Sequence, residues 1–458
     1  MKRLNYCNTC FDKQRTIDRL QVENQRLRDK LRIRDRQADG YFGSSTPSSQ
    51  IPVKANSLEE NQKKRGGAVH GHSGHGRAAI SGDMADRVLE VDGAEKCPQC
   101  GGNLQDCGAV ERTVIESQPL RGERIVYRIP KKRCTRCKKT YRAQVPGVLP
   151  KSLFGNGLLA TAAGMHYLHG VPQGRVCEQL GIGDGSLFES MHRLAKLFEG
   201  VLEPLRQAYR QSPVKHADET GWRNDGHSGY AWLFCTETLS LFEFRDTRSA
   251  RVPKEVLGET SLPGVLVVDR YAGYNKVPCA IQYCYAHLLR EVQDLQKEFP
   301  EDKEVASFAS TLGPLLAMAM GLRNQEISDT EFYSRARQTK AAIQQIAAAP
   351  AQHLGIRRIQ DIFTDHEARL YHWASSRAVP ADNNRSERDL RPTVIARKVS
   401  HGSQSEKGAK TRSTLATVFH TLKKRTASPV AAFRLALDQL ALDPSLNPHA
   451  ILFPENSS

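Results

Sequence analysis

The stretch GVLVVD, residues 264–269, decides the fold of this 458-residue chain, because its near-continuous apolar run suits a strand buried on both faces. Short aromatic and β-branched runs lie on either side of it, separated by turn-forming residues. They predict further strands at 214–220, 230–237, 239–244 and 281–285. Helices are expected at 249–257 and 286–299, so these elements together predict a mixed sheet with helices on its faces.

Composition narrows the class of protein. Hydrophobic residues make up 39% and charged residues 25% of the chain, which excludes a collagen-like, rod-like or wholly disordered molecule. No apolar run of about 18 residues occurs and the first residues lack the apolar core of a signal peptide, so we expect a soluble, cytoplasmic protein. The net charge of +16 favours nucleic acid as the partner, although a solvated basic surface with no partner would have the same composition.

Four cysteines predict a metal site. Cys97 and Cys100 form one pair, Cys134 and Cys137 form another, and both pairs have two residues between the cysteines. Two such knuckles in a polar module, residues 86–148, are typical of a tetrahedral structural zinc site, and four reduced buried cysteines are the alternative. The role of a third pair, Cys7 and Cys10, stays open.

The other segments differ in composition. Residues 1–39 hold a short heptad pattern that predicts either a coiled coil or a lone surface helix (Ile17, Leu20, Asn24, Leu27 and Leu31). Residues 40–85 are rich in Gly, Ser and basic residues, as flexible linkers are. Residues 150–212 predict helices that resemble a helix-turn-helix carrying Arg193, or three ordinary packed helices. We expect a helical insertion at 301–376 and a basic region with two further helices at 393–458.

Acidic residues follow two of the expected strands. Asp218 ends the first strand and Asp269 ends the buried one, where a charge is costly unless it is paired or binds a cation. Two carboxylates at one sheet edge suit Mg²⁺, although either aspartate alone is more often a turn or cap residue. A third carboxylate, Glu387, would share a helix face with Asn383, Asn384, Arg388 and Arg391 in NNRSERDLRP, residues 383–392. We expect Pro392 to end or bend that helix.

Four segments together resemble the transposases of the insertion-sequence 66 family: HADETGW (216–222), VVDRYAGYN (267–275), YCYAHLLRE (283–291) and NNRSERDLRP (383–392). The resemblance covers nearly the whole chain. It implies a multidomain α/β protein with an RNase H-like catalytic core at 213–392, interrupted by the helical insertion. It also implies an Asp-Asp-Glu triad formed by Asp218, Asp269 and Glu387.

The activity implied by this resemblance is cleavage of transposon ends and strand transfer into target DNA by a polynucleotidyl transferase. Two Mg²⁺ ions per active site would serve it, with Mn²⁺ as a possible substitute. The implied partners are double-stranded DNA, further copies of the chain on that DNA and accessory transposition proteins, in a bacterial nucleoid and with no membrane. A nuclease without strand transfer and an inactive DNA-binding regulator are the alternatives.

Several further residues are expected to contact DNA or to support the triad. Arg388 and Arg391 would contact the DNA backbone beside the metals, and Arg193 and Lys398 would contact DNA elsewhere. Cys284 and His287 form a pair similar to a signature found after the second acid in many such enzymes. His287 would contact DNA or brace the site, and Cys284, expected on a strand, would equally suit core packing. The chain departs from common family residues at Arg270 and Ser386, but neither change removes a ligand.

Overall fold

The computed structural model describes residues 16–17, 19–25, 99–100, 120–129, 131–133, 135, 137, 140–142 and 144–454. The chain forms two units, Val53–Arg121 and the remainder, and the sheet and helices from α2 to α15 belong to the second. Residues 16–17 and 19–25 are helical, as the heptad pattern predicts, but Leu27, Leu31 and the 40–85 linker lie outside the described residues. Self-association of the helix stays a prediction.

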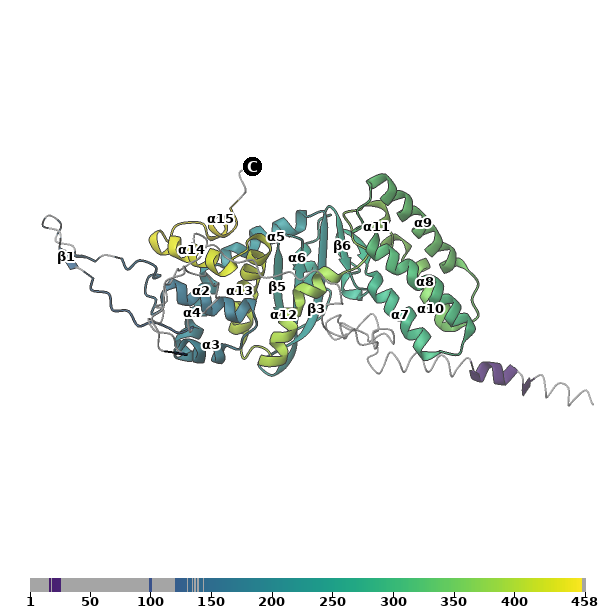
Figure 1. Cartoon of the computed structure of the whole chain (residues 1–458), viewed down its shortest axis with the longest axis horizontal. Coiled ribbons are helices and arrows are strands. Elements are labelled where there is room, and N and C mark those ends of the chain that lie inside the picture. The colour runs from purple at the N-terminus through teal and green to yellow at the C-terminus, as the bar shows by residue number, and fades with distance from the viewer. Residues whose placement is uncertain are drawn as a thin grey trace, which may run out of the picture. The chain divides into compact units, whose positions relative to one another are not determined.

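A five-stranded mixed sheet forms the centre of the second unit (Figure 1). Its strands, in sheet order, are β5 (Ser240–Arg245), β4 (His227–Cys235), β3 (Val214–Asn224), β6 (Val265–Val268) and β7 (Ala280–Tyr283). The first three pair antiparallel, and β6 runs parallel to both β3 and β7. The expectation of a mixed sheet with helices around it is confirmed.

The two faces of the sheet carry different helices. Alternation along β3 places Ala217 and Glu219 on a face whose core includes residues of α5 (Leu202–Gln211) and α6 (Arg251–Leu257). Trp222 lies on the other face, in a smaller apolar cluster with Leu390 and Val394 of α12 (Asn384–Ser400). Helix α12 therefore packs over the face that carries the even-numbered residues of β3 (Figure 1).

Helix α12 passes through Pro392 and continues to Ser400, so this proline does not end the helix, and a bend at this position stays a prediction. Proline removes one backbone donor and disfavours a helical residue before it. Here the apolar contacts of Leu390 and Val394 with the sheet lie on both sides of the proline, and this packing holds both parts in one helix. Three helices follow, where two were expected: α13 (Glu406–Arg425), α14 (Pro429–Leu442) and α15 (Pro448–Leu452).

Helix α13 covers the edge strand β5 by an unusual set of bonds. The backbone N–H groups of Ser240, Phe242 and Phe244 face outward from the sheet, and each donates to a hydroxyl of α13. The acceptors are Thr421, Thr417 and Ser413, at 3.1, 2.9 and 3.2 Å. Four residues of helix rise about 6.0 Å, close to the roughly 6.8 Å of two strand residues. One hydroxyl per helical turn therefore meets every second strand residue.

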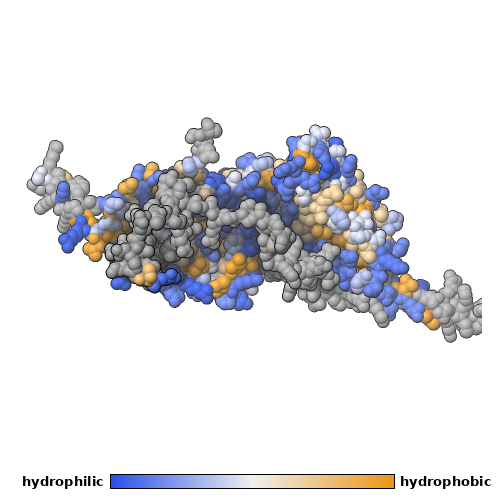
Figure 2. Space-filling view, in the orientation of Figure 1, coloured by the Kyte–Doolittle hydropathy of each residue, from blue (hydrophilic) through white to orange (hydrophobic). Residues whose placement is uncertain are grey.

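The expected insertion is helical, as predicted. It contains α8 (Lys303–Leu322), α9 (Asp329–Ala348), α10 (Leu354–Asp365) and α11 (His372–Ser375), and follows α7 (Tyr285–Glu298). Within the described residues, α8 is the one helix long and apolar enough to suit a membrane span. It packs against α7 and α9 as a core helix does, and the insertion surface in Figure 2 mixes hydrophilic and hydrophobic residues.

The helices expected at 150–212 are present as α2 (Asn156–Ala163), a π-helical turn (Gly164–Leu168), α3 (Gln173–Leu180), α4 (Asp184–Leu197) and α5. Gly181 ends α3 at a φ of 66°, which a glycine adopts without strain. Helix α4 packs on α13: Glu189 forms an ion pair with Lys407, and His192 hydrogen-bonds Thr411 at 2.6 Å. If α4 enters a DNA groove, these two side chains must first leave α13.

Strands β1 (Lys131–Arg133) and β2 (Thr140–Arg142) pair as a small antiparallel hairpin, and Cys137 lies between them in the sequence. Cys100 and Cys137 are exposed, and Cys97 and Cys134 lie outside the described residues. The four-cysteine zinc site therefore stays a prediction, and so does the role of Cys7 and Cys10.

Candidate active site

Asp218 and Asp269 lie at equivalent heights on neighbouring strands. In the parallel pairing of β3 and β6, His216 is opposite Val267. Two residues further along each chain come Asp218 and Asp269, so the register sets the two acids side by side. The chain folds this way because the apolar run 265–268 lies between β3 and β7 and ends directly before Asp269.

Both carboxylates are buried, with exposed fractions of 2% for Asp218 and 3% for Asp269. Asp218 Oδ1 accepts the backbone N–H of Glu219 at 2.9 Å, and Asp269 Oδ1 accepts that of Tyr271 at 3.0 Å. The second oxygen of Asp269 is buried and has no hydrogen-bond partner. A buried carboxylate oxygen without a donor suits a cation in its place.

The pKa of Asp269 also favours a bound cation at this position. Burial, helped by the nearby charge of Glu219, raises the pKa of Asp269 well above its usual range. The guanidinium groups of Arg248 and Arg270 oppose that shift. A bound divalent cation would favour the ionised carboxylate in the same way, more strongly and at shorter range.

Glu219 follows Asp218 in β3, and its side chain therefore has its own partners on the opposite face of that strand. Its buried carboxylate accepts two bonds from Arg248, at 2.9 and 2.6 Å, and one from the hydroxyl of Tyr274 at 2.5 Å. Arg248 in turn lies over the ring of Tyr271, 3.9 Å from its centre. These contacts fix the backbone on either side of Asp218 and Asp269.

Asn383 attaches the helix of the third acid to the strand of the first. It occupies the N-cap of α12, yet its side chain makes no capping bond. Its Nδ2 instead donates to the carbonyl of Ala217 at 2.9 Å, and its Oδ1 lies 2.9 Å from Nδ1 of His216. Its backbone N–H donates to Sγ of Cys284 at 3.1 Å. Asn383 therefore attaches the first turn of α12, which carries Glu387, to the backbone of β3. Asp218 was expected to end the first strand, but it lies within β3, which continues to Asn224.

Cys284 connects the same region to β6. Its backbone N–H donates to the carbonyl of Val268, the residue before Asp269, at 2.9 Å. Cys284 was expected on a strand but forms the N-cap of α7, which places His287 in the first turn of that helix. Val268, Cys284 and Asn383 thus form a short chain of contacts from Asp269 to the start of α12.

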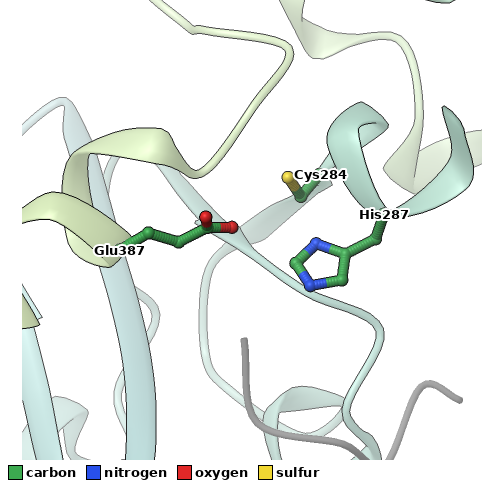
Figure 3. A group of neighbouring side chains, drawn as sticks. All are labelled: Cys284, His287 and Glu387. Atoms are coloured by element: carbon green, nitrogen blue, oxygen red, sulfur yellow. The ribbon is translucent and has the colours of Figure 1, made fainter. Parts of the chain in front are cut away.

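The carboxylate of Glu387 extends from α12 toward Cys284 and His287 (Figure 3). Its Oε2 lies 3.6 Å from Arg290, and its Oε1 is buried without a partner. Burial is the main cause that raises the pKa of Glu387, and Arg290 opposes it. Among the described residues, Glu387 forms a close group of possible metal ligands with Cys284 and His287, whereas the three acids are not such a group.

The residues expected to contact DNA differ in exposure. Arg388, Arg391, Lys398 and Arg193 are exposed, so phosphate groups could reach all four. His287 is only 9% exposed, which favours a role inside the site over direct contact with DNA. Arg270 is bonded to Glu291 of α7, and Ser386 is buried with its hydroxyl on the carbonyl of Asn383.

Sequence reasoning missed the residues that surround the acids, chiefly Arg248, Tyr274 and Arg290. It placed Asn383 on the right helix face but gave it no role. The signal available for these residues was their position within or next to the quoted segments, because Tyr274 lies in VVDRYAGYN and Arg290 in YCYAHLLRE.

Comparison with known proteins gives two matches. A family model described as "Transposase IS66 family" matches residues 151–411, which is more than half of the chain and includes all three acids. An uncharacterized protein, y4qI, from Sinorhizobium fredii (strain NBRC 101917 / NGR234) is 25% identical over 391 residues. That similarity covers 73% of this chain and 70% of the relative.

Proposed function

This chain belongs to the IS66 family of transposases, which makes DNA its substrate, and on that premise we propose that Asp218, Asp269 and Glu387 are its catalytic triad. The observation that carries the proposal is the shared register of Asp218 and Asp269, with a buried, unpartnered oxygen on the second. The strand order is also what an RNase H-like core would require. Glu387 would complete the triad from α12, as the resemblance implies.

The residues present fit a pair of hard divalent cations. Asp218 and Asp269 offer carboxylate oxygens side by side, and Glu387 offers another from the helix packed over the same face. When bound, Mg²⁺ ions would activate the attacking oxygen and stabilise the charge on the leaving oxygen. Mn²⁺ has the same preference for oxygen ligands and could replace Mg²⁺.

Two in-line displacements at phosphorus would follow. In the first, a water oxygen loses a proton and bonds to the scissile phosphorus, the bond to the 3′ oxygen breaks, and that oxygen takes a proton to become a 3′-hydroxyl. In the second, this hydroxyl oxygen loses its proton and bonds to a phosphorus of target DNA, and the displaced second 3′ oxygen takes a proton. Asp218 and Asp269 would serve both steps in the same position, since their strands fix them.

DNA would approach the exposed basic side chains of α12. Arg388 and Arg391 lie one and four residues beyond Glu387, and Lys398 lies near the end of the same helix. Arg193 of α4, which is also exposed, would contact DNA elsewhere. The predicted four-cysteine zinc module and the N-terminal helix would add element-end binding and assembly on DNA, together with any accessory transposition proteins.

The test uses the full chain, Mg²⁺ and a duplex carrying the terminal inverted repeat, whose sequence is found in the DNA flanking the gene. Nicked ends and joined products are expected. Asp269→Asn should remove both products and keep DNA binding. Asp361→Asn, on an exposed position of α10, is the matched control and should behave as the parent.

Each rival reading has a distinct outcome. Nicks that are never joined would indicate a nuclease without strand transfer, and DNA binding without any product would indicate a regulator. If Asp269→Asn cleaves DNA as fast as the parent, the triad assignment is wrong.

A further inference from the structure

A second set of metal ligands lies next to the proposed triad and shares one residue with it. Sγ of Cys284, a ring nitrogen of His287 and a carboxylate oxygen of Glu387 all lie within 4.8 Å of one another. Figure 3 shows the three side chains converging from the start of α7 and from α12. The two-residue spacing between Cys284 and His287 places both on the N-terminal turn of one helix, so they can act together.

Three polar atoms of this cluster lack hydrogen-bond partners. Neither ring nitrogen of His287 has a hydrogen bond, although the residue is only 9% exposed, and Oε1 of Glu387 is also buried and unpartnered. A buried polar atom left in this state costs about 1–3 kcal/mol, so several in one place call for a missing ligand. A direct bond between His287 and Glu387 would satisfy one nitrogen and one oxygen, but the structure does not contain it.

The ligand types select the metal. A thiol, an imidazole and a carboxylate are a donor set for Zn²⁺ or a similar transition metal, whereas Mg²⁺ prefers oxygen ligands alone. With bond lengths of roughly 2.0–2.3 Å, ligand atoms in a tetrahedral zinc site lie about 3.5 Å apart. Side chains that already lie within 4.8 Å need only small movements to reach that geometry.

Charge and neighbours set the limits of this site. A thiolate and a carboxylate together neutralise a divalent cation. Arg290 lies 3.6 Å from Oε2 of Glu387 and opposes a cation, but Oε1 remains available on the other side of the carboxylate. The backbone N–H of Asn383, which donates to Sγ of Cys284, favours the thiolate form.

We propose that Cys284, His287 and Glu387 form a Zn²⁺-type site with an open fourth position, separate from the predicted four-cysteine module. Zn²⁺ bound there would withdraw Glu387 from Asp218 and Asp269, and would therefore inhibit Mg²⁺-dependent cleavage. This second consequence depends on the proposed function, whereas metal binding does not.

Metal binding is tested on the metal-free full chain. After equilibrium dialysis against Zn²⁺, mass spectrometry should count one metal ion fewer in Cys284→Ser and in His287→Gln than in the parent. Cys279→Ser changes a cysteine outside the cluster and should bind as the parent does. Circular dichroism checks that each variant is folded. Equal metal counts in the parent and both cluster variants would overturn the proposal.

A second measurement leaves the cluster intact, in case its variants do not fold. With Cys97→Ser and Cys134→Ser introduced to disable the predicted module, Co²⁺ should still give a thiolate-to-metal absorption band, with the intensity of one thiolate. The lack of any such band would also overturn the proposal, and would indicate that a hydrogen bond between His287 and Glu387 satisfies the cluster in solution.

The activity arm separates the two proposals. Added Zn²⁺ should inhibit Mg²⁺-dependent cleavage by the parent and by Cys279→Ser. Inhibition should be at least tenfold weaker in His287→Gln, scored against that variant's own rate in Mg²⁺. If no metal supports cleavage, the proposed function fails, but the metal counts still decide the zinc site. Equal inhibition of all variants would refute the shared role of Glu387.

Discussion

Replacing Asn383 by alanine tests whether this residue holds Glu387 in place by attaching helix α12 to strand β3, which carries Asp218. In the parent, the buried amide of Asn383 bonds to the carbonyl of Ala217 and to Nδ1 of His216. Asn383→Ala removes both bonds and leaves two buried polar groups without partners. It keeps the backbone N–H that donates to Cys284 and the start of α12.

The expected loss of unfolding free energy depends on how many buried polar groups lose their hydrogen-bond partners. Each buried polar group that loses its partner costs about 1–3 kcal/mol, so two of them cost about 2–6 kcal/mol of unfolding free energy. With an unfolding entropy of about 2.1 cal/mol/K per residue, a chain of 458 residues loses roughly 1 °C of Tm per kcal/mol, which predicts a Tm lower by about 2–6 °C. If the displacement of Glu387 raises the activation free energy of cleavage by about 1.4 kcal/mol, the cleavage rate falls about tenfold. We expect a decrease of at least this size.

The assay combines urea denaturation, followed by tryptophan fluorescence, with DNA cleavage at a temperature where the variant is folded. Asn384→Ala is the matched control, because this neighbouring asparagine is exposed and its side chain makes none of these bonds. If Asn383→Ala is as stable as Asn384→Ala and cleaves DNA at the same rate, α12 is not positioned through Asn383.

Three further predictions concern the framework around the site. Arg248→Met should cost about 3–5 kcal/mol because it leaves the buried Glu219 carboxylate without its cation; adding Glu219→Gln should recover most of that loss in urea denaturation. Burial lowers the pKa of His420 to about 4 from its usual 6.5, so the unfolded chain binds a proton first as the pH falls. Stability should therefore fall between pH 6.5 and about 4 by up to about 3 kcal/mol from this residue, and His420→Gln should flatten the profile in thermal melts. Thr417→Val removes the acceptor of the Phe242 N–H and should cost about 1–3 kcal/mol in the same melts, whereas an unchanged Tm would show that water replaces the hydroxyl.

The strands near Asp218 and Asp269 were predictable because a local sequence pattern indicates them. The apolar run of β6 ends at an acid, and that pattern needs no knowledge of distant residues. The first strand was expected to end at residue 220 but continues to Asn224. The signal for this was Asp225-Gly226, since both residues adopt positive φ in the two-residue turn that joins β3 to β4.

The surroundings of the acids were less predictable because they depend on distant contacts. Asn383 bonds to residues 166 and 167 positions away, and no local pattern encodes such a pairing. The continuation of α12 past Pro392 was not predictable for a similar reason, since packing of α12 on the sheet outweighs the local preference of proline. The position of Cys284 after β7, and not within it, brought it next to His287 and Glu387.

The hydroxyl contacts between α13 and β5 make the spacing of that helix as critical as its composition. Inserting one residue between Ser413 and Thr421 would turn part of the helix by about 100°, so its hydroxyls would point away from the strand. The backbone of β5 would then be open to pairing with another chain, and self-association would follow. The same insertion after Arg425, beyond the end of α13, would leave the register of these hydroxyls unchanged.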